Sequence, residues 1–215
     1  MSTLFSRDSI LSFLKETAQT IITALILTGF IYYFIATPNQ VQGSSMYPNV
    51  LPDELILTSR FKHHLSTSEL GKRLGWDYHH GQIIIFEKPG KEAFIKRIIA
   101  IPGDTVLLEG NRIIINGETI HELYLSDDIK TSAGNFLREG IEVTVPEESY
   151  IVLGDNRTNS LDSRHQDVGF VHFEDIIGPA ELRILPINRL GIIPIGETEP
   201  DEHEANPNIE VTLSD

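Results

Sequence analysis

A serine and a lysine stand in contexts where their side chains could do chemistry together. Ser45 lies in the segment Gly-Ser-Ser-Met-Tyr-Pro at residues 43–48, and Lys96 is the lysine of the apolar run Phe-Ile-Lys-Arg-Ile-Ile-Ala at residues 94–100. A serine hydroxyl is a weak nucleophile until a base takes its proton. A lysine can be that base when burial or neighbouring groups keep its amine neutral. The two residues are therefore a candidate nucleophile and a candidate general base.

Side-chain alternation along the apolar run predicts the surroundings of Lys96. Successive residues of a strand point to opposite faces of the sheet, so Lys96 shares a face with Phe94 and Ile98. The other face is apolar except for Arg97. A strand that is apolar on both faces is expected to be buried on both, and burial would lower the pKa of the Lys96 amine. The alternative is an ordinary strand lysine that extends its amine into water.

A third segment, Gly-Asp-Asn-Arg-Thr-Asn-Ser-Leu-Asp-Ser-Arg at residues 154–164, is rich in groups that form hydrogen bonds. Its composition alone favours a polar surface loop. The alternative is an ordered loop in which aspartate and arginine side chains pair and Ser160 orients an amine. Residue types within the segment leave both interpretations open.

An apolar segment near the N-terminus is long enough to cross a membrane. No charged residue occurs between Glu16 and Asp53, and residues 18–37 within that interval are mostly apolar. About 20 residues is the length that a helix needs to cross the hydrocarbon core of a bilayer. Tyr32 and Tyr33 near the outer end are typical of an interfacial aromatic belt.

The flanks of this segment favour an uncleaved anchor with its N-terminus inside. A cleaved signal peptide is the alternative, but the Ala-Thr-Pro sequence at residues 36–38 is a poor cleavage site because proline disfavours cleavage. Arg7 and Lys15 precede the segment, and no positive residue follows it immediately. This bias favours a cytoplasmic N-terminus, at residues 1–17, and a main domain on the outer face.

Beyond residue 50 the sequence is typical of a β-rich domain. Short runs of β-branched and other apolar residues, bounded by turn residues, predict strands. The predicted strands lie within residues 54–58, 82–86, 93–101, 113–120, 149–153 and 179–185. The run at 113–120 contains Asn-Gly and predicts a hairpin with a type I′ turn, whereas residues 62–78 are expected to form a loop with a helical turn at 66–74. The pattern favours a mainly β domain, barrel-like or built as a folded sheet.

Composition limits the partners and the chemistry. The net charge of −14 argues against a nucleic-acid partner, because phosphates would be repelled. Cysteine is absent, and the eight histidines lack the spacing of a helical metal site, so no metal or other cofactor is expected. No histidine stands in a context that supports a Ser-His-Asp triad. Residues 197–215 are strongly acidic and polar, and we expect them to form a disordered tail.

The three segments that contain Ser45, Lys96 and Ser160 together resemble the type I signal peptidases of bacteria. The family pattern is S-M-x-P after an anchor, then K-R followed by a P-G-D turn, then G-D-N-R-x-N-S-x-D-S-R. Matching residues occur here in the same order, at 45–48, 96–104 and 154–164. Residues 185–191 also resemble the closing segment of the family, so the resemblance covers about residues 10–195.

This resemblance implies a membrane-anchored serine endopeptidase that removes signal peptides from exported preproteins, cutting after small residues of the Ala-x-Ala type. It implies that Ser45 is the nucleophile and that neutral Lys96 is the general base. It further implies that Ser160 orients the Lys96 amine. The expected supporting ion pairs are Arg97 with Asp155 and Arg164 with Asp162. The residues expected in the substrate-binding site are Met46, Gly43 and Ser44.

The fold that the resemblance implies is an all-β catalytic domain, here residues 38–196, with a smaller β segment inserted at 106–144. The implied partners are preproteins and the lipid bilayer of the cell membrane, with the export translocon nearby. Two other functions remain as alternatives: a related Ser-Lys protease with another task, and a membrane-tethered β domain without activity.

The sequence departs from the family pattern at two positions. Some members carry a serine two positions before the nucleophile as a second oxyanion donor, and this chain has Gly43 there. Backbone groups or Ser44 would have to take that role. Four residues at 165–168 also separate Arg164 from Gly169, where many members have fewer, which we interpret as a loop insertion.

Overall fold

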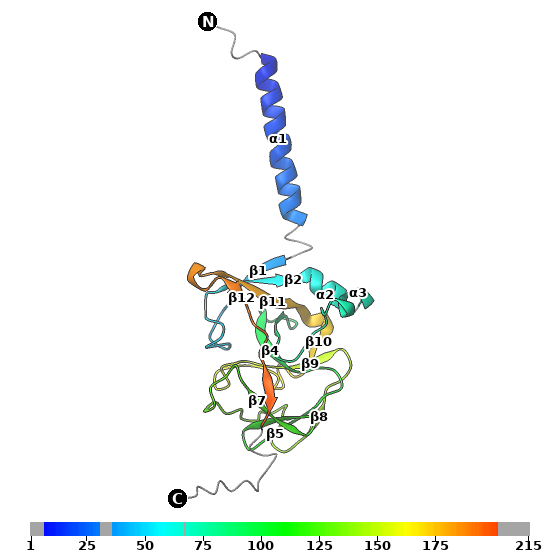
Figure 1. The fold of residues 1–215 in the computed structure, drawn as a ribbon, viewed down its shortest axis with the longest axis vertical. Helices are drawn as coiled ribbons and strands as arrows, with labels where there is room; N and C mark the ends of the chain where they lie inside the picture. The colour runs from blue at the N-terminus through cyan, green and yellow to red at the C-terminus, as the bar shows by residue number, and fades with distance from the viewer. Residues whose placement is uncertain (1–6, 31–35, 67, 202–215) are drawn as a thin grey trace, which may run out of the picture.

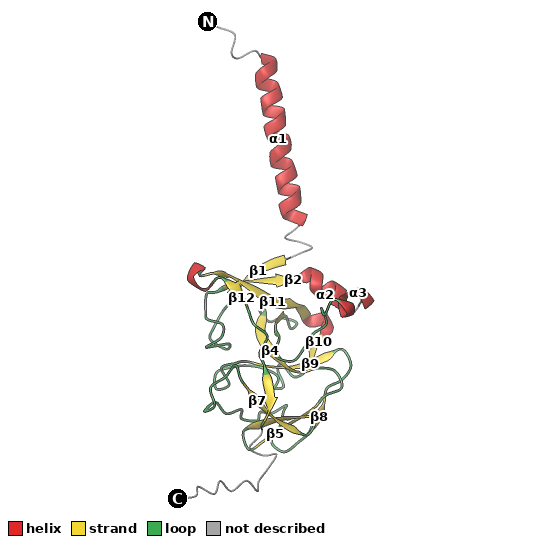
Figure 2. Ribbon diagram, in the orientation of Figure 1, coloured by secondary structure: helices red, strands yellow, loops and turns green. Residues whose placement is uncertain are grey.

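A long N-terminal helix and a β domain built from two antiparallel sheets make up the molecule (Figures 1 and 2). The computed structural model describes residues 7–30, 36–66 and 68–201. Helix α1 (Arg7–Phe30) includes the stretch Ile10–Phe30, which is long and apolar enough to cross a membrane. None of that stretch is buried against the rest of the protein, so its apolar side chains have no protein surface to cover them.

The predicted anchor at residues 18–37 differs from α1 at both ends. The helix begins before residue 18, and residues 31–35, with the two tyrosines of the expected aromatic belt, lie outside the described residues. The last two residues of the predicted anchor belong instead to strand β1 (Ala36–Gln40). They are held there because β1 pairs along its whole length with the next strand, beginning with Ala36 opposite Ser59.

The larger sheet has the strand order β1-β2-β11-β3-β4-β9-β10, with β12 beside β11, and all of its neighbouring strands are antiparallel. Besides β1, its strands are β2 (Leu55–Ser59), β3 (Ile83–Phe86), β4 (Phe94–Ala100), β9 (Ser149–Leu153), β10 (Val171–His172), β11 (Ile176–Leu185) and β12 (Gly191–Ile192). Every residue of β3 and β9 is buried, and β4 is buried from its second residue on. The central strands are therefore covered on both faces, as their continuous apolar sequences predict.

Strand β11 changes partner along its length and bends the larger sheet. Its first half, through Pro179, pairs with β3, and its second half, from Ala180, pairs with β2. Gly178 lies at the change, where a Cβ atom would stand 2.7 Å from the carbonyl oxygen of Ser59. Irregular pairing and a glycine at a close approach are typical of a sheet that curls on itself. The predicted folded sheet is confirmed.

The smaller sheet has the strand order β13-β7-β6-β5-β8 and lies at the end of the β domain away from α1 (Figure 1). Its strands are β5 (Thr105–Glu109), β6 (Arg112–Ile115), β7 (Glu118–Glu122), β8 (Val143–Thr144) and β13 (Thr198–Pro200). The predicted hairpin is β6–β7, and Asn116 and Gly117 in its turn have φ angles of 53° and 83°. Two positive φ angles are what a type I′ turn requires, so the Asn-Gly prediction holds.

Two expectations about irregular segments need correction. The predicted helical turn at 66–74 is present as α3 (Glu69–Arg73), but the part expected to be loop also contains a helix, α2 (Arg60–Ser66), because α2 packs on β1 and β11 and buries His63, whose ring bonds to Tyr78. Two one-turn 3₁₀ helices, η2 (Phe173–Asp175) and η3 (Ile187–Arg189), flank β11.

The expected disordered tail is the second correction. Its first residues form β13, which pairs with β7 at the edge of the smaller sheet. Backbone pairing requires no apolar side chains, so the acidic composition of this segment did not reveal a strand. Residues 202–215 lie outside the described part of the chain.

Candidate active site

Ser45 and Lys96 lie side by side although they are 51 positions apart in the sequence. Ser45 belongs to the turn that follows β1, and Lys96 lies within β4. The Lys96 Nζ atom is 2.7 Å from Ser45 Oγ, and it donates a second hydrogen bond to the carbonyl oxygen of Ile95 at 2.8 Å. When the amine is neutral, the serine hydroxyl can donate across the same contact. The pair can therefore pass a proton from the hydroxyl to the amine.

Burial lowers the pKa of the Lys96 amine. The residue is 3% exposed, and its strand is paired on both sides, with β3 and with β9. Loss of hydration lowers the pKa of Lys96 from 10.5 to about 8, while the carboxylates of Asp162 and Asp155 oppose part of that change. A substantial fraction of the amine is therefore neutral near pH 8, which is the form that a general base needs.

Residues 154–164 form an ordered and largely buried loop around Ser45, so the surface-loop interpretation is wrong. The backbone N–H of Asn156 donates to the carbonyl oxygen of Ser45 at 2.9 Å, and the Asn156 side chain donates to the carbonyl oxygen of Ser44 at 3.1 Å. At Gly154, a Cβ atom would stand 2.5 Å from the Ser45 carbonyl oxygen. Glycine is thus the residue that allows the loop to approach the turn this closely.

Two buried ion pairs fix this loop, and both join residues that the sequence analysis selected. Arg97 donates two hydrogen bonds to Asp155, at 2.8 and 2.7 Å, with side chains 2% and 0% exposed. Arg164 donates in the same two-pronged manner to Asp162, at 2.8 and 2.9 Å. Burial favours the neutral acid of Asp162, but the hydrogen bonds and charge of Arg164 prevail and hold its pKa below the ordinary value.

The Arg97–Asp155 pair has further partners that sequence reasoning missed. The Asn49 side chain donates to Asp155 at 2.8 Å, and the Arg97 guanidinium lies 4.0 Å from the centre of the Tyr124 ring. A third Arg97 hydrogen bond goes to the carbonyl oxygen of Gly81. Asn49 closely follows the nucleophile, a weak signal, but Tyr124 has no local sequence feature that could connect it to the site.

Ser160 does not hold the Lys96 amine as expected. Its hydroxyl is buried and interacts with the Asp162 carboxylate, whose pKa it helps to lower, whereas the amine bonds to Ser45 and to a backbone carbonyl. Ser160 Oγ instead packs against Gly154, 2.2 Å from where a Cβ atom would stand.

A cleft of about 760 Å³ opens onto the Ser45–Lys96 pair. One wall is the chain from the end of β1 to the turn of Ser45, at residues 39–42, and the opposite wall is residues 91–96 at the start of β4. Ile85 and Leu161 add apolar surface to the lining. Two nearly extended segments flanking a nucleophile leave room for an extended peptide between them.

The three residues expected in the substrate-binding site are not part of the cleft lining within the described structure. Met46 is 1% exposed and packs in the core cluster that contains Val41 and Ile56. The hydroxyl of Ser44 accepts a hydrogen bond from Asn159 at 3.0 Å, on the loop side. Gly43 has a φ angle of 73° and serves the turn rather than a pocket.

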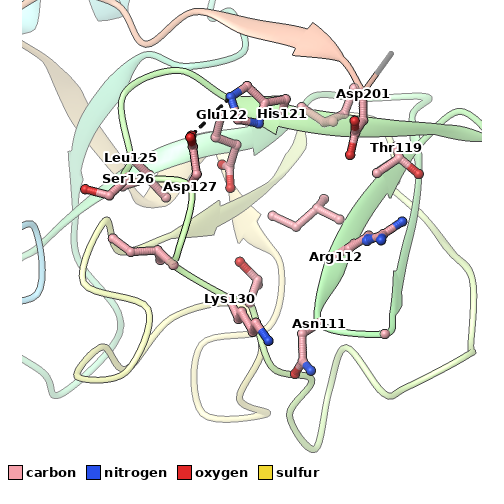
Figure 3. Close-up of a pocket in the computed structure, with 15 residues that line it drawn as sticks. Asn111, Arg112, Thr119, His121, Glu122, Leu125, Ser126, Asp127, Lys130 and Asp201 are labelled. Atoms are coloured by element: carbon pink, nitrogen blue, oxygen red, sulfur yellow. Dashed lines mark ion pairs between the residues drawn. The ribbon is translucent and has the colours of Figure 1, made fainter. Parts of the chain in front are cut away.

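A second pocket, of about 280 Å³, lies in the smaller sheet away from the Ser45–Lys96 pair (Figure 3). It is polar, and His121 and Asp127 face each other there at 3.6 Å. Glu122 also lines it and accepts hydrogen bonds of 2.5 and 2.6 Å from Arg157 of the 154–164 loop. The pocket therefore borders an ion pair that joins β7 of the smaller sheet to the 154–164 loop. Among the described residues, no His, Asp and Glu side chains are grouped as a metal site would require.

A family model and several similar proteins all point to the same family. Residues 14–185 match the family model described as signal peptidase, peptidase S26. Signal peptidase I P of Bacillus subtilis subsp. natto is 31% identical over 176 residues, which cover 80% of this chain and 89% of that protein. Signal peptidase I of Leptolyngbya laminosa is 33% identical over 179 residues, covering 83% of each chain. Signal peptidase I U of Bacillus subtilis strain 168 is 34% identical over 175 residues, covering 79% and 85%.

The buried ion pair at Arg97 can be tested by its effect on stability. Asp155→Asn removes the charge that balances the buried guanidinium, and we expect the free energy of unfolding to fall by about 3–5 kcal/mol. The matched control is Glu181→Gln, which breaks the Lys62–Glu181 pair, whose side chains are 35% and 34% exposed. That change is expected to cost at most about 1 kcal/mol. Denaturant unfolding in detergent micelles measures both, and equal losses would contradict the structural role given to Asp155.

Proposed function

The chain belongs to the signal peptidase family, peptidase S26, and from this premise we propose that Ser45 and Lys96 perform the removal of signal peptides from preproteins. The observation that carries the proposal is the 2.7 Å contact between the Ser45 hydroxyl and a buried lysine amine of lowered pKa. A surface lysine would be protonated at neutral pH and could not accept the proton.

The proposed reaction has two halves that use the same pair. Neutral Lys96 takes the Ser45 proton while Oγ attacks the carbonyl carbon of the peptide bond to be cut. The resulting ammonium gives its proton to the leaving amine, which frees the mature protein and leaves an ester on Ser45. Lys96 then takes a proton from water while the water oxygen attacks the ester carbonyl, and the ammonium returns that proton to the leaving Ser45 Oγ, which releases the signal peptide and restores the starting pair.

The oxyanion that forms in each half is placed near the Ser45 backbone N–H. That N–H makes no hydrogen bond within the described residues, so it is free to donate to a developing negative charge. Gly43 has no side chain to add, whereas the Ser44 hydroxyl accepts a hydrogen bond from Asn159 and keeps its own proton to donate. We therefore assign the oxyanion to the Ser45 backbone N–H, with the Ser44 hydroxyl as the candidate second donor.

The lining of the cleft supports a substrate with small residues before the cleavage point. The peptide would lie extended between residues 39–42 and 91–96, with its alternate side chains directed toward apolar lining such as Val41 and Ile85. Both of these residues are nearly buried, so they offer little apolar surface for a substrate side chain to cover. Shallow apolar surfaces accept alanine and reject large or charged side chains, as an Ala-x-Ala site requires.

The direct test is to remove each member of the pair. Ser45→Ala and Lys96→Ala should each lower the rate of preprotein cleavage by about a thousandfold or more, since the two groups act as a unit. Thermal melting of each variant would verify that the fold is kept. Full activity in either variant would contradict the Ser-Lys mechanism and would favour a domain whose function does not depend on these residues.

The pKa of Lys96 predicts how the rate depends on pH. Because the neutral amine is the active form, kcat/KM should rise about tenfold per pH unit well below pH 8 and level off above it. Cleavage of a soluble peptide with an Ala-x-Ala site, followed from about pH 6 to pH 10, measures the profile. A rate that does not change over the acidic half of this range would contradict a lysine base.

We also propose that α1 spans the membrane with its N-terminus in the cytoplasm and places the β domain on the outer face, near the export translocon. The absence of cysteine allows single thiols to be introduced, by Ser9→Cys before the span and by Ser126→Cys in the β domain. In spheroplasts, an impermeant maleimide should label the second variant and not the first. Labelling of the Ser9→Cys variant and not of the Ser126→Cys variant would contradict the orientation.

Nearness to the export translocon has a separate test. A thiol cross-linker attached to the Ser126→Cys variant should recover translocon subunits, and failure to recover them would contradict the proposed position beside the translocon.

A further inference from the structure

The hairpin formed by α2 and α3, residues 60–76, presents large apolar side chains to solvent. Phe61, Leu70 and Leu74 are 46%, 58% and 51% exposed. The rings of Phe61 and Trp76 pack edge to face with centres 5.7 Å apart, which joins the two ends of the hairpin. Leu70 and Leu74 are four positions apart and lie on one side of α3 and its last turn. The exposed apolar groups therefore form a cluster rather than isolated side chains.

The position of this cluster is set by the strand that follows the anchor. Ala36, the first residue of β1, pairs with Ser59, and α2 begins at the next residue, Arg60. The six steps from Phe30 to Ala36 span at most about 20 Å even when fully extended. Figure 1 places α2 and α3 at the end of the β domain nearest α1. The hairpin thus lies close to the level at which the chain leaves the membrane.

The charge of the hairpin differs from that of the whole chain. The net charge of the protein is −14, but residues 60–76 contain four lysines and arginines and a single glutamate; of the four, Lys62 is paired with Glu181. Arg73 is exposed beside Leu74, and His64 is exposed on α2. Aromatic and leucine side chains rimmed by basic residues are the pattern of segments that lie in the head-group region of anionic bilayers. An acidic protein surface would instead be repelled by such lipids.

We propose that the α2–α3 hairpin lies on the membrane, with Phe61, Leu70, Leu74 and Trp76 among the head groups of anionic lipids. This inference rests on the membrane anchoring in the proposed function, because α1 is what brings the hairpin to the bilayer. The anchor fixes where the domain is, and the hairpin fixes how it is tilted. Two attachments hold the cleft at one height above the lipid, whereas the anchor alone leaves the domain free to rotate.

Trp76 is the single tryptophan of the chain, so its fluorescence reports on the hairpin alone. The full chain would be reconstituted in phosphatidylcholine–phosphatidylglycerol vesicles, with lipids brominated either near the head group or near the end of the acyl chain. We expect the emission to shift to the blue relative to detergent and to lose most of its intensity with the shallow bromines. Emission that neither shifts nor is quenched would overturn the proposal.

Two variants and one lipid change separate the outcomes. The double variant Leu70→Ser, Leu74→Ser should lose most of the quenching, while the control Ile141→Ser, at a residue 44% exposed in the loop before β8 of the smaller sheet, should retain it. Equal quenching in vesicles without phosphatidylglycerol would show that the basic residues of the hairpin do not contribute to its binding, and would overturn the preference for anionic lipids. Protein that fails to float with the vesicles would refute the anchoring, whereas protein that floats without quenching refutes only the hairpin contact.

Discussion

The site depends on keeping one lysine amine neutral among several charged groups. Asp155 and Asp162 are close enough to Lys96 to raise its pKa, which by itself would favour the inactive ammonium form. Each carboxylate is bonded to a buried guanidinium, that of Arg97 or of Arg164. The amine therefore experiences two nearly neutral pairs rather than two negative charges, and the loss of hydration decides its pKa. Arg97 and Arg164 thus help to keep the Lys96 amine neutral, although neither contacts it.

Strand β4 supplies both the general base, Lys96, and the cation that balances Asp155, Arg97, as two consecutive residues. Because neighbouring strand residues point to opposite faces, Lys96 faces the cleft while Arg97 faces the loop and Tyr124 on the other side. The strand is central in the larger sheet and almost wholly buried, so neither side chain can move far. The base and the cation that balances its surroundings are thus positioned by the same piece of backbone.

The sequence was most informative where local pattern and burial agree. The continuous apolar runs predicted β3, β4 and β9 because central strands are buried on both faces, and the Asn-Gly pair predicted the β6–β7 turn because both positions need positive φ. The motif order brought Ser45, Lys96 and the 154–164 loop together in one hypothesis, and the structure places all three in contact.

What the sequence did not reveal depends on tertiary contacts between distant segments. Glu122 meets Arg157 across 35 positions, and β13 is a strand only because β7 offers it an edge. The sequence of the α2–α3 hairpin lacks a clear helical periodicity of apolar residues, because its helices are short and α2 is held by packing on β1 and β11. Met46 follows the nucleophile in sequence, but the turn directs its side chain into the core, which residue type alone does not fix.

Strand β1 is at once the first element after the anchor and part of the wall of the cleft. Asn39 and Gln40 line the site of cleavage, and only residues 31–35 separate their strand from the helix. The short connection between α1 and β1 therefore limits how far Ser45 can lie from the bilayer. With α1 in the membrane as proposed, the cleft would reach only peptide bonds that lie within the short distance of the bilayer that this connection allows, whatever side chains precede them.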